Sequence, residues 1–392
     1  MRALEGRRLW FVGIGGAGLS AYAAIASAWG AEVGGWDRVD TPYLESLREH
    51  ELVIAPDPVV PDGWQVVVST AYADRVEGMT RAAFLAELVS LRETVVVSGA
   101  HGKTTTTGMI AYALSRLGRD PTYAIGGDIP QLGGNAGTGE GWFVVEGDES
   151  DRTIAALRPQ IAVVLNVELD HHSEFASLAE VQALFDEWTL LVPLVVRAEE
   201  LEPVDFELVL RGEHNRRNAA AALAALELCG VDREEARPHI AAFEGAARRF
   251  QLRGEVGGVV VYDDYAHHPT EVAATISTAR EVSTGRVLVL FQPHLYSRTR
   301  HLAHELGRAL ASADVVAIAD VYAAREREGD VRGKIVADAV SDARGGARIG
   351  WMPSAEEGAR WLASLAAPGD VLLTVGAGNV DGAVPVLLEA LA

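Results

Sequence analysis

Short apolar runs recur along the whole chain, and each is followed by glycine or polar residues and then by a segment with helical spacing. Runs of this kind, rich in β-branched and aromatic residues, predict buried strands. The predicted strands are residues 9–12, 32–36, 94–97, 142–145, 161–165, 259–262, 287–291, 315–319 and 371–375. Because strands that alternate with helices form parallel sheets, the pattern indicates an α/β protein.

The pattern divides the chain into three blocks, residues 1–92, 93–245 and 246–392. A chain of 392 residues has room for two or three domains, each with its own core. The first and third blocks have the repeated strand–helix pattern of Rossmann-like folds, whereas the middle block opens with a strand, a glycine turn and a helix. We therefore expect three domains, in which two Rossmann-like domains flank a central P-loop ATPase-like domain.

The segment 98–107, Ser-Gly-Ala-His-Gly-Lys-Thr-Thr-Thr-Thr, lies between a predicted strand and a predicted helix at 108–117. Such a turn predicts a nucleotide-phosphate site, because its N–H groups and the helix N-terminus face the anion, the lysine neutralises it and the hydroxyl ligates Mg²⁺. The common P-loop pattern has a glycine where this chain has Val97, so the loop is the tighter Gly-x-x-Gly-Lys-Thr. The alternative is an ordinary strand–helix turn.

A second glycine motif, Gly-Ile-Gly-Gly-Ala-Gly at 13–18, follows the first predicted strand. Asp37 ends the next strand, about twenty residues further on, which is the Rossmann-type spacing of a phosphate-binding turn and a ribose-binding acid. Three interpretations stay open on these residues alone: a nicotinamide dinucleotide site, a UDP-type site on a similar fold, and a tight turn without a ligand.

Acidic residues and histidines follow two strands of the middle block. Glu146 begins the run Glu-Gly-Asp-Glu-Ser-Asp, and residues 166–172 read Asn-Val-Glu-Leu-Asp-His-His. Carboxyl ends of parallel strands are where α/β folds build sites, and carboxylate oxygens beside a phosphate loop suit Mg²⁺. We expect Glu146 to hold the metal and His171 to offer a neutral nitrogen to a second divalent ion. The alternative is that these are solvated loop residues.

Further polar segments stand at element ends in the rest of the chain. Residues 212–218 lead into a predicted helix at 219–228, and one interpretation of Asn215 is an N-cap with no other role. The predicted strands of the third block end in polar or glycine-rich segments at residues 263–271, 292–294, 320–322 and 376–379. Four such strand ends together predict a binding rim.

Composition excludes several functional classes. The net charge of −21 argues against a nucleic-acid-binding surface. No apolar run is long enough to cross a bilayer, the N-terminus lacks the pattern of a signal peptide, and Cys229 is the one cysteine, so we expect a cytoplasmic protein without membrane association. Lys103 and Lys334 are the only lysines, which leaves Lys103 as the one lysine in the phosphate loop.

The motifs occur together in one order. They are Gly-x-His-Gly-Lys-Thr-Thr-Thr (99–106), Glu-x-Asp-Glu-Ser-Asp (146–151), Asn-x-Glu-x-Asp-His (166–171), Gly-x-His-Asn-x-x-Asn (212–218), Asp-Asp-Tyr-Ala-His-His-Pro-Thr-Glu (263–271), Phe-Gln-Pro-His (291–294) and Asp-Val-Tyr-Ala-Ala (320–324). Over residues 9–382 the chain resembles the Mur ligases. It is most similar to the branch that joins L-alanine to UDP-N-acetylmuramate, because Phe-Gln-Pro-His is followed by Tyr-Ser-Arg-Thr at 296–299, which the branch that recycles murein tripeptide usually lacks.

The resemblance implies an ATP-dependent amide ligase of peptidoglycan precursor synthesis. ATP would convert the carboxylate of UDP-N-acetylmuramate to an acyl phosphate, which the amine of L-alanine would attack. The implied cofactors are ATP and Mg²⁺, with Mn²⁺ as an alternative, and the expected assembly is a monomer or homodimer. The alternatives are addition of murein tripeptide to the same sugar nucleotide, an NAD-dependent oxidoreductase, and a catalytically silent relative.

The resemblance also implies roles for individual residues. The implied ATP-binding residues are Gly99, Ala100, His101, Gly102, Lys103, Thr104, Thr105, Asn166, Asn215, Asp263 and Asp264. The implied substrate-binding residues are Gly15, Gly16, Ala17, Gly18 and Asp37 for the UDP-sugar, and Tyr265, His267, His268 and Arg298 for the amino acid and the intermediate. The implied metal ligands are Thr104, Glu146 and His171, and the implied catalytic residues are Lys103, His267 and Arg298. His267 would serve either as a base for the amine or as a histidine that fixes its loop.

The chain departs from the family pattern in a few places. Segments within 72–80 and 186–212 are short, and Leu295 stands where the family usually has arginine. Some relatives use a carbamylated lysine at the second Mg²⁺, but this chain has no lysine between Lys103 and Lys334. The sequence leaves open the choice among L-alanine, glycine and L-serine.

Overall fold

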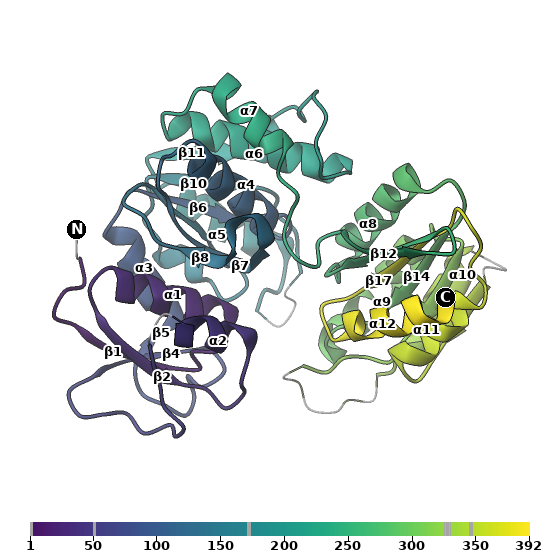
Figure 1. Cartoon of the computed structure of the whole chain (residues 1–392), viewed down its shortest axis with the longest axis horizontal. Coiled ribbons are helices and arrows are strands. Elements are labelled where there is room, and N and C mark those ends of the chain that lie inside the picture. The colour runs from purple at the N-terminus through teal and green to yellow at the C-terminus, as the bar shows by residue number, and fades with distance from the viewer. Residues whose placement is uncertain are drawn as a thin grey trace. The chain divides into compact units, whose positions relative to one another are not determined.

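Three sheets, each mostly parallel, organise the protein (Figure 1). The computed structural model describes residues 3–49, 52–170, 174–324, 326, 329, 331–344 and 348–392. The chain forms two compact units. The first comprises Met1–Glu168, Leu178–Leu210 and Arg216–Ala246, and the second comprises Leu169–Ser177, Arg211–Asn215 and Ala247–Ala392.

The first sheet of the first unit has the strand order β3-β2-β1-β4-β5, which is the order of a Rossmann fold. Its strands are β1 (Arg8–Val12), β2 (Glu32–Trp36), β3 (Val53–Ile54), β4 (Gln65–Val68) and β5 (Met79–Thr80). Its helices are α1 (Ala17–Ala28), α2 (Pro42–Glu49) and α3 (Arg81–Ser90). All the pairings in this sheet are parallel, so the glycine turn after β1 opens at the carboxyl edge.

The second sheet of the first unit has the order β11-β10-β6-β9-β7-β8. Its strands are β6 (Thr94–Ser98), β7 (Thr122–Ile129), β8 (Gly134–Gly137), β9 (Phe143–Glu146), β10 (Ile161–Val164) and β11 (Leu194–Arg197). The helices of this part of the chain are α4 (Lys103–Arg116), α5 (Leu178–Thr189), α6 (Glu213–Leu228) and α7 (Arg233–Ala241). Helix α1 packs on β7 and β8, which joins the two sheets of the unit.

The sheet of the second unit has the order β12-β13-β17-β14-β15-β16, with β12 antiparallel and the others parallel. Its strands are β12 (Gln251–Val256), β13 (Val259–Asp264), β14 (Val287–Phe291), β15 (Val315–Ile318), β16 (Arg348–Trp351) and β17 (Val371–Val375). Its helices are α8 (Pro269–Val282), α9 (Tyr296–Leu310), α10 (Lys334–Arg344), α11 (Ala355–Ala363) and α12 (Val384–Leu391).

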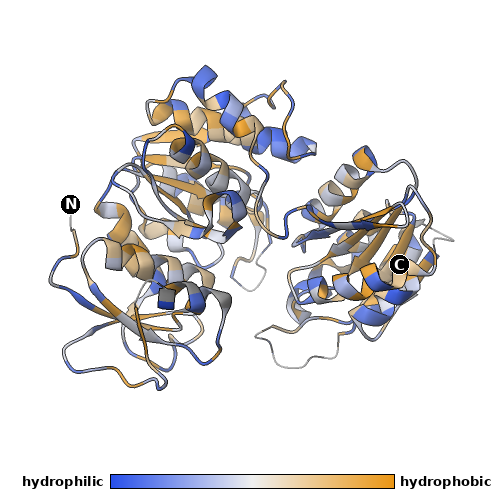
Figure 2. Ribbon diagram, in the orientation of Figure 1, coloured by the Kyte–Doolittle hydropathy of each residue, from blue (hydrophilic) through white to orange (hydrophobic). Residues whose placement is uncertain are grey.

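Both faces of this sheet are buried, which explains the continuous apolar runs of its strands. Val289 and Phe291 of β14 pack with α8, α9 and α10, while Leu288 and Leu290 pack with α11 and α12 on the opposite face. In Figure 2 the strands are mostly orange, the colour of hydrophobic residues, and the blue hydrophilic residues lie on outer helix surfaces and loops. Among the helices in the described ranges, none has the length and apolar character that a membrane span requires.

The predicted α/β fold is confirmed, with three sheets where three domains were expected, and several strands begin and end where the apolar pattern placed them. The block boundaries at 92 and 245 stay predictions. The interpretation of Asn215 as an N-cap is wrong, because α6 begins at Glu213 and therefore includes Asn215 in its first turn. The Asn215 side chain donates from Nδ2 to the carbonyl of Arg211 at 2.8 Å.

Candidate active site

The predicted phosphate loop connects β6 to α4, and two of its glycines have left-handed backbones. Gly99 has φ +142° and Gly102 has φ +83°. A Cβ at Gly102 would lie 2.5 Å from Oδ1 of Asn218, so no side chain fits there. Gly102 is also the N-cap of α4 and provides no side-chain cap, which leaves the N–H groups of the first helical turn to face an anion.

Lys103 is the first residue of α4, and its ammonium group is held inside the loop. Its Nζ donates to the carbonyl oxygen of Gly99 at 2.6 Å and to Oε2 of Glu149 at 2.9 Å. Burial by itself would lower the pKa of Lys103, but the carboxylates of Glu149 and Asp148 outweigh it and raise the pKa above its ordinary value. Lys103 is therefore a fixed positive charge at neutral pH.

Asn166 ties the phosphate loop to the end of β10. Its Oδ1 accepts a hydrogen bond from the backbone N–H of His101 at 2.8 Å, and its Nδ2 donates to the carbonyl of His101 at 2.9 Å. The ring Nε2 of His101 lies 3.3 Å from Oε2 of Glu168. These contacts join segments 65 residues apart and fix the conformation of the loop.

Glu146 ends β9 at the register position opposite Val97 of β6, beside the phosphate loop. Its Oε1 accepts a hydrogen bond from the N–H of Gly126 at 2.6 Å. A Cβ at Gly126 would lie 2.9 Å from Oε2 of Glu146, and one at Gly127 would lie 3.2 Å from Cγ2 of Thr104. Gly126 thus leaves room beside the carboxylate of Glu146, while Gly127 lies against the methyl group of Thr104, whose side chain also carries a hydroxyl. Carboxylate and hydroxyl oxygens are hard ligands that suit Mg²⁺.

Three further predicted residues belong to the phosphate loop or to the metal site. Thr105 is buried next to Thr104 in the first turn of α4. Ala100 donates its backbone N–H to the carbonyl of Asn166 at 3.3 Å. His171 lies outside the described residues, so its predicted role as a ligand of a second divalent ion stays a prediction.

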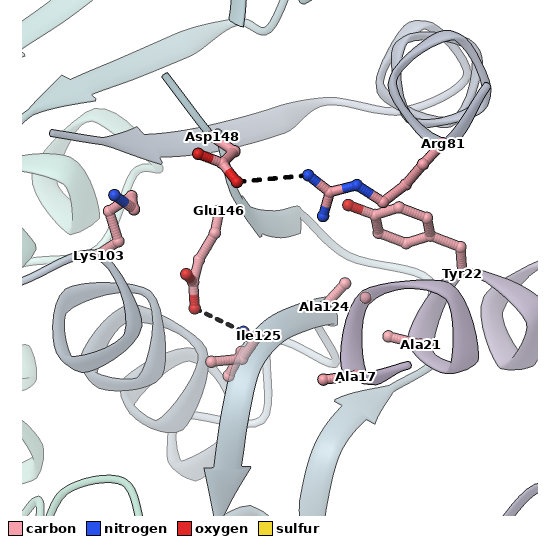
Figure 3. Close-up of a pocket in the computed structure, with 11 residues that line it drawn as sticks. Ala17, Ala21, Tyr22, Arg81, Lys103, Ala124, Ile125, Glu146 and Asp148 are labelled. Atoms are coloured by element: carbon pink, nitrogen blue, oxygen red, sulfur yellow. Dashed lines mark hydrogen bonds and ion pairs between the residues drawn. The ribbon is translucent and has the colours of Figure 1, made fainter. Parts of the chain in front are cut away.

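A cavity of about 250 Å³ opens between α1 and the phosphate loop, as Figure 3 shows. The first turn of α1, Arg81 and Lys103 contribute positive groups to its lining, and Glu146 and Asp148 contribute carboxylates. Tyr22 of α1 also lines it, and burial raises the pKa of its hydroxyl to about 12. The cavity can therefore accept an anion on one side and a divalent cation on the other.

The glycine motif after β1 reaches this cavity through its last two residues, Ala17 and Gly18. Asp37 instead fixes the turn, because its Oδ2 accepts a hydrogen bond from the N–H of Gly15 at 2.8 Å. Gly16 is the N-cap of α1 without a side-chain cap. The helix N-terminus therefore points its first-turn N–H groups toward a ligand, while the carboxylate of Asp37 is occupied by the loop itself.

Sequence reasoning missed Arg81 and Tyr22 as cavity residues, and it quoted Asp148 and Glu149 only as part of a motif. Arg81 nevertheless has a signal in the sequence. It directly follows Thr80, which caps α3, so it places a cation at the positive end of a helix dipole, where acidic residues are favoured. A residue that breaks a local preference in this way indicates a functional position.

In the second unit, two predicted ATP-binding aspartates have protein partners. Asp263 accepts hydrogen bonds from Nε of Arg248 at 2.9 Å and from the hydroxyl of Thr374 at 2.6 Å. Asp264 accepts from the N–H groups of Phe250 and Ala266, both at 2.7 Å, and burial raises the pKa of its carboxyl to about 6. Both side chains hold the segment after β13 in place.

In the next residues of that segment, His268 and Tyr265 make structural contacts that surround His267. His268 is the N-cap of α8 and forms a capping box with Glu271, which explains its burial. The ring of Tyr265 lies beneath the guanidinium groups of Arg248 and Arg249, at 5.2 and 5.3 Å from its centroid. Both contacts make the segment a rigid support for the residue between them, His267.

His267 is neutral at physiological pH. Its Nδ1 lies 3.1 Å from the carbonyl oxygen of Tyr265, which assigns the ring hydrogen to Nδ1 and leaves a lone pair on Nε2. Burial lowers the pKa of His267 to about 4, against the opposing effect of Glu271. A neutral imidazole of this kind can accept a hydrogen bond from an amine.

We expect His267 to make the stability of the protein depend on pH in acid. Since its ordinary pKa is 6.5 and its folded pKa about 4, the unfolded chain binds more protons in this window, and stability is lost as the pH falls through it. The raised pKa of Asp264 has the opposite effect, because it makes stability rise as the pH falls. The contribution of His267 is therefore measured against a variant that lacks the imidazole. Urea unfolding at several pH values should show wild type losing stability relative to H267Q below about pH 6.5, and parallel curves would contradict this.

Arg298 forms a buried ion pair with Asp170. Its Nε lies 3.0 Å from Oδ1 of Asp170 and its Nη2 lies 3.2 Å from Oδ2, while Nη1 lies 3.3 Å from Nδ1 of His294. Both charged side chains are less than a tenth exposed. The guanidinium that the resemblance implies for the amino acid and the intermediate therefore has a carboxylate partner of its own from the segment after β10.

Comparisons with known proteins show similarity along nearly the whole chain. The Mur ligase middle domain matches residues 97–187, and the glutamate ligase domain of Mur ligases matches residues 248–378. The UDP-N-acetylmuramate–L-alanine ligase of Streptomyces coelicolor is 38% identical over 449 aligned positions that cover 97% of each chain. That of Kineococcus radiotolerans is 40% identical over 457 positions, which cover 98% of this chain and 96% of the relative.

A solved structure agrees in fold along nearly the whole chain. The UDP-N-acetylmuramate–alanine ligase of Thermotoga maritima matches with a TM-score of 0.78 and 26% identity, over 97% of this chain and 98% of that one. The aligned positions of the two sequence relatives outnumber the 392 residues here, so those relatives contain segments that this chain lacks. With identity at this level along nearly its full length, the protein belongs to the Mur ligase family.

Proposed function

We propose that this protein joins L-alanine to UDP-N-acetylmuramate with conversion of ATP to ADP and phosphate, in the synthesis of peptidoglycan precursors. The observation that carries the proposal is the partly buried Lys103 at the start of α4, fixed by Glu149 in a chain whose sequence relatives are UDP-N-acetylmuramate–L-alanine ligases. A nicotinamide oxidoreductase would leave this lysine and its loop without a role.

The chemistry balances in two steps. An oxygen of the acceptor carboxylate attacks the γ-phosphorus of ATP, the bond from that phosphorus to the bridging oxygen breaks, and ADP leaves. The amine nitrogen of L-alanine then attacks the acyl carbon, the bond to the phosphate oxygen breaks, and phosphate and one proton leave. Both steps bring anions together, so the enzyme contributes mainly by positioning and by stabilising negative charge.

The first unit would bind ATP and the metal. Lys103 and the N–H groups at the start of α4 would hold the β- and γ-phosphates, and His101 would stay fixed by Asn166. Thr104 and Glu146 would hold Mg²⁺, which supplies charge neutralisation for the phosphates when bound. The second unit would present L-alanine through the neutral imidazole of His267, with Arg298 as the nearby cation.

The test is phosphate release from ATP and Mg²⁺ with UDP-N-acetylmuramate across a panel of single amino acids and murein tripeptide. We expect release that depends on both the sugar nucleotide and L-alanine, and mass spectrometry should find the amide product. Release with tripeptide alone would assign the protein to recycling, and release with glycine or L-serine in preference would correct the amine. Silence with every amine would reject the proposal.

A further inference from the structure

Arg81 is a cation in the cavity of the first unit, and neither step of the proposed reaction described above assigns it a role. It begins α3, where the helix dipole disfavours a positive charge. Its side chain is about a quarter exposed, and it lines the cavity together with Lys103 and the first turn of α1. Figure 3 shows the guanidinium beside Tyr22, across the cavity from Lys103.

Most of the hydrogen-bonding capacity of this guanidinium is unused by the protein. Its Nη2 donates to Oδ2 of Asp151 at 3.0 Å and to Oδ2 of Asp148 at 3.4 Å. Its Nε and Nη1 have no acceptor in the part of the chain that the structure describes. A Cβ at Gly18 would lie 3.1 Å from Nη1, so the glycine keeps this side of the guanidinium open. The remaining donors suit a small oxyanion.

Two consecutive carboxylates hold the two cations of the cavity. Asp148 contacts Arg81, and Glu149 contacts Lys103. A reaction between a carboxylate and a phosphate needs a cation for each, at a fixed separation, because the two anions repel one another. Lys103 lies in the phosphate loop, and the N–H groups of α1 suit the diphosphate of the sugar nucleotide. Arg81 is the cation that remains for the second reacting anion.

We propose that Arg81 binds the carboxylate of the sugar-nucleotide acceptor and holds it for attack on the γ-phosphate of ATP. This inference rests on the proposed function, since it names the residue that orients the group activated there. The Asp148 and Asp151 contacts fix the guanidinium in advance, so little side-chain entropy is lost when the acceptor binds. Arg81 is then a binding residue of the acceptor that also sets its reacting atom in place.

The test compares two ligands that differ at this carboxylate. UDP-N-acetylmuramate and UDP-N-acetylglucosamine share the uridine diphosphate and the amino sugar, and only the first has the lactyl carboxylate. In calorimetric titration of the full chain, R81Q should bind UDP-N-acetylmuramate about 10- to 100-fold more weakly than wild type and bind UDP-N-acetylglucosamine within about threefold of wild type. The KM for UDP-N-acetylmuramate should rise with it, while the KM for ATP should not.

Two further variants make the result decisive. R48Q alters an exposed arginine of α2 that pairs with Asp40 at 2.9 Å, and it should change neither affinity. R81K keeps the positive charge but lacks the planar guanidinium. If R81Q folds poorly, R81K takes its place in the test, and it must then lose affinity for the carboxylate-bearing ligand alone. Equal losses for both ligands would mean that Arg81 binds the diphosphate or only supports the fold, and unchanged affinities would mean that it binds neither. Wild type that neither binds nor turns over UDP-N-acetylmuramate would instead overturn the proposed function itself.

Discussion

K103A is expected to lower the rate of phosphate release in the presence of UDP-N-acetylmuramate and L-alanine by at least about 100- to 1,000-fold. The reason is that Lys103 is the fixed cation of the phosphate loop, and water replaces it poorly in a partly buried site. The same change leaves Glu149 buried without its cation, which should destabilise the protein by about 3–5 kcal/mol. The measurements are coupled phosphate release and urea unfolding.

The chain offers a matched control for this experiment. Lys334 is the only other lysine, and it is exposed on α10 in a pair with Asp338, so K334A should keep full activity and stability. The double variant K103M/E149Q removes both members of the buried pair. It should recover most of the lost stability and remain inactive, which separates catalysis from folding. Phosphate release by folded K103A within about threefold of wild type would contradict the role of the lysine.

R298A is expected to destabilise the second unit by about 3–5 kcal/mol, because it leaves the buried carboxylate of Asp170 without its cation. It should also raise the KM for L-alanine, since Arg298 is the proposed cation near the amine-binding imidazole of His267. R298K should recover only part of both losses, because a lysine cannot form the two parallel contacts that Nε and Nη2 make with Asp170. Urea unfolding and steady-state kinetics measure the two effects.

Helix α9 contains its own control for R298A. Arg308 is exposed, near the end of the same helix, and pairs with Glu305 at 3.4 Å, so R308A should change the free energy of unfolding by less than about 0.5 kcal/mol. D170N should also destabilise the protein, because it leaves the buried guanidinium of Arg298 without its anionic partner. A double variant with the summed losses of R298A and D170N would show that the two residues do not act together.

The residues of the phosphate loop illustrate what local sequence can predict. The β-branched run of β6, the left-handed glycine at 102 and the lysine that starts α4 lie within ten positions, and each conformation follows from the residue itself. The continuous apolar runs of strands such as β14 and β17 likewise follow from burial on both faces. The motifs therefore predicted the elements and the approximate place of the site.

Other site residues depend on partners far away in the chain. Asn166 and Asp37 were predicted to bind ligands. In the structure, Asn166 contacts His101 and Asp37 contacts Gly15, so each side chain fixes a loop. Asp170 was part of a motif, but nothing in the motif indicated that Arg298 is its partner.

The sequence by itself determined which segments become strands, helices and glycine turns, because those choices depend on neighbouring residues and on burial of apolar runs. Only the tertiary structure decided which charges meet. It pairs Lys103 with Glu149 and Arg81 with Asp148, and it brings both cations to one cavity. The physical reason is that an ion pair is set by the distance and dielectric between side chains that strand order and packing bring together, and a linear pattern of residues contains neither quantity.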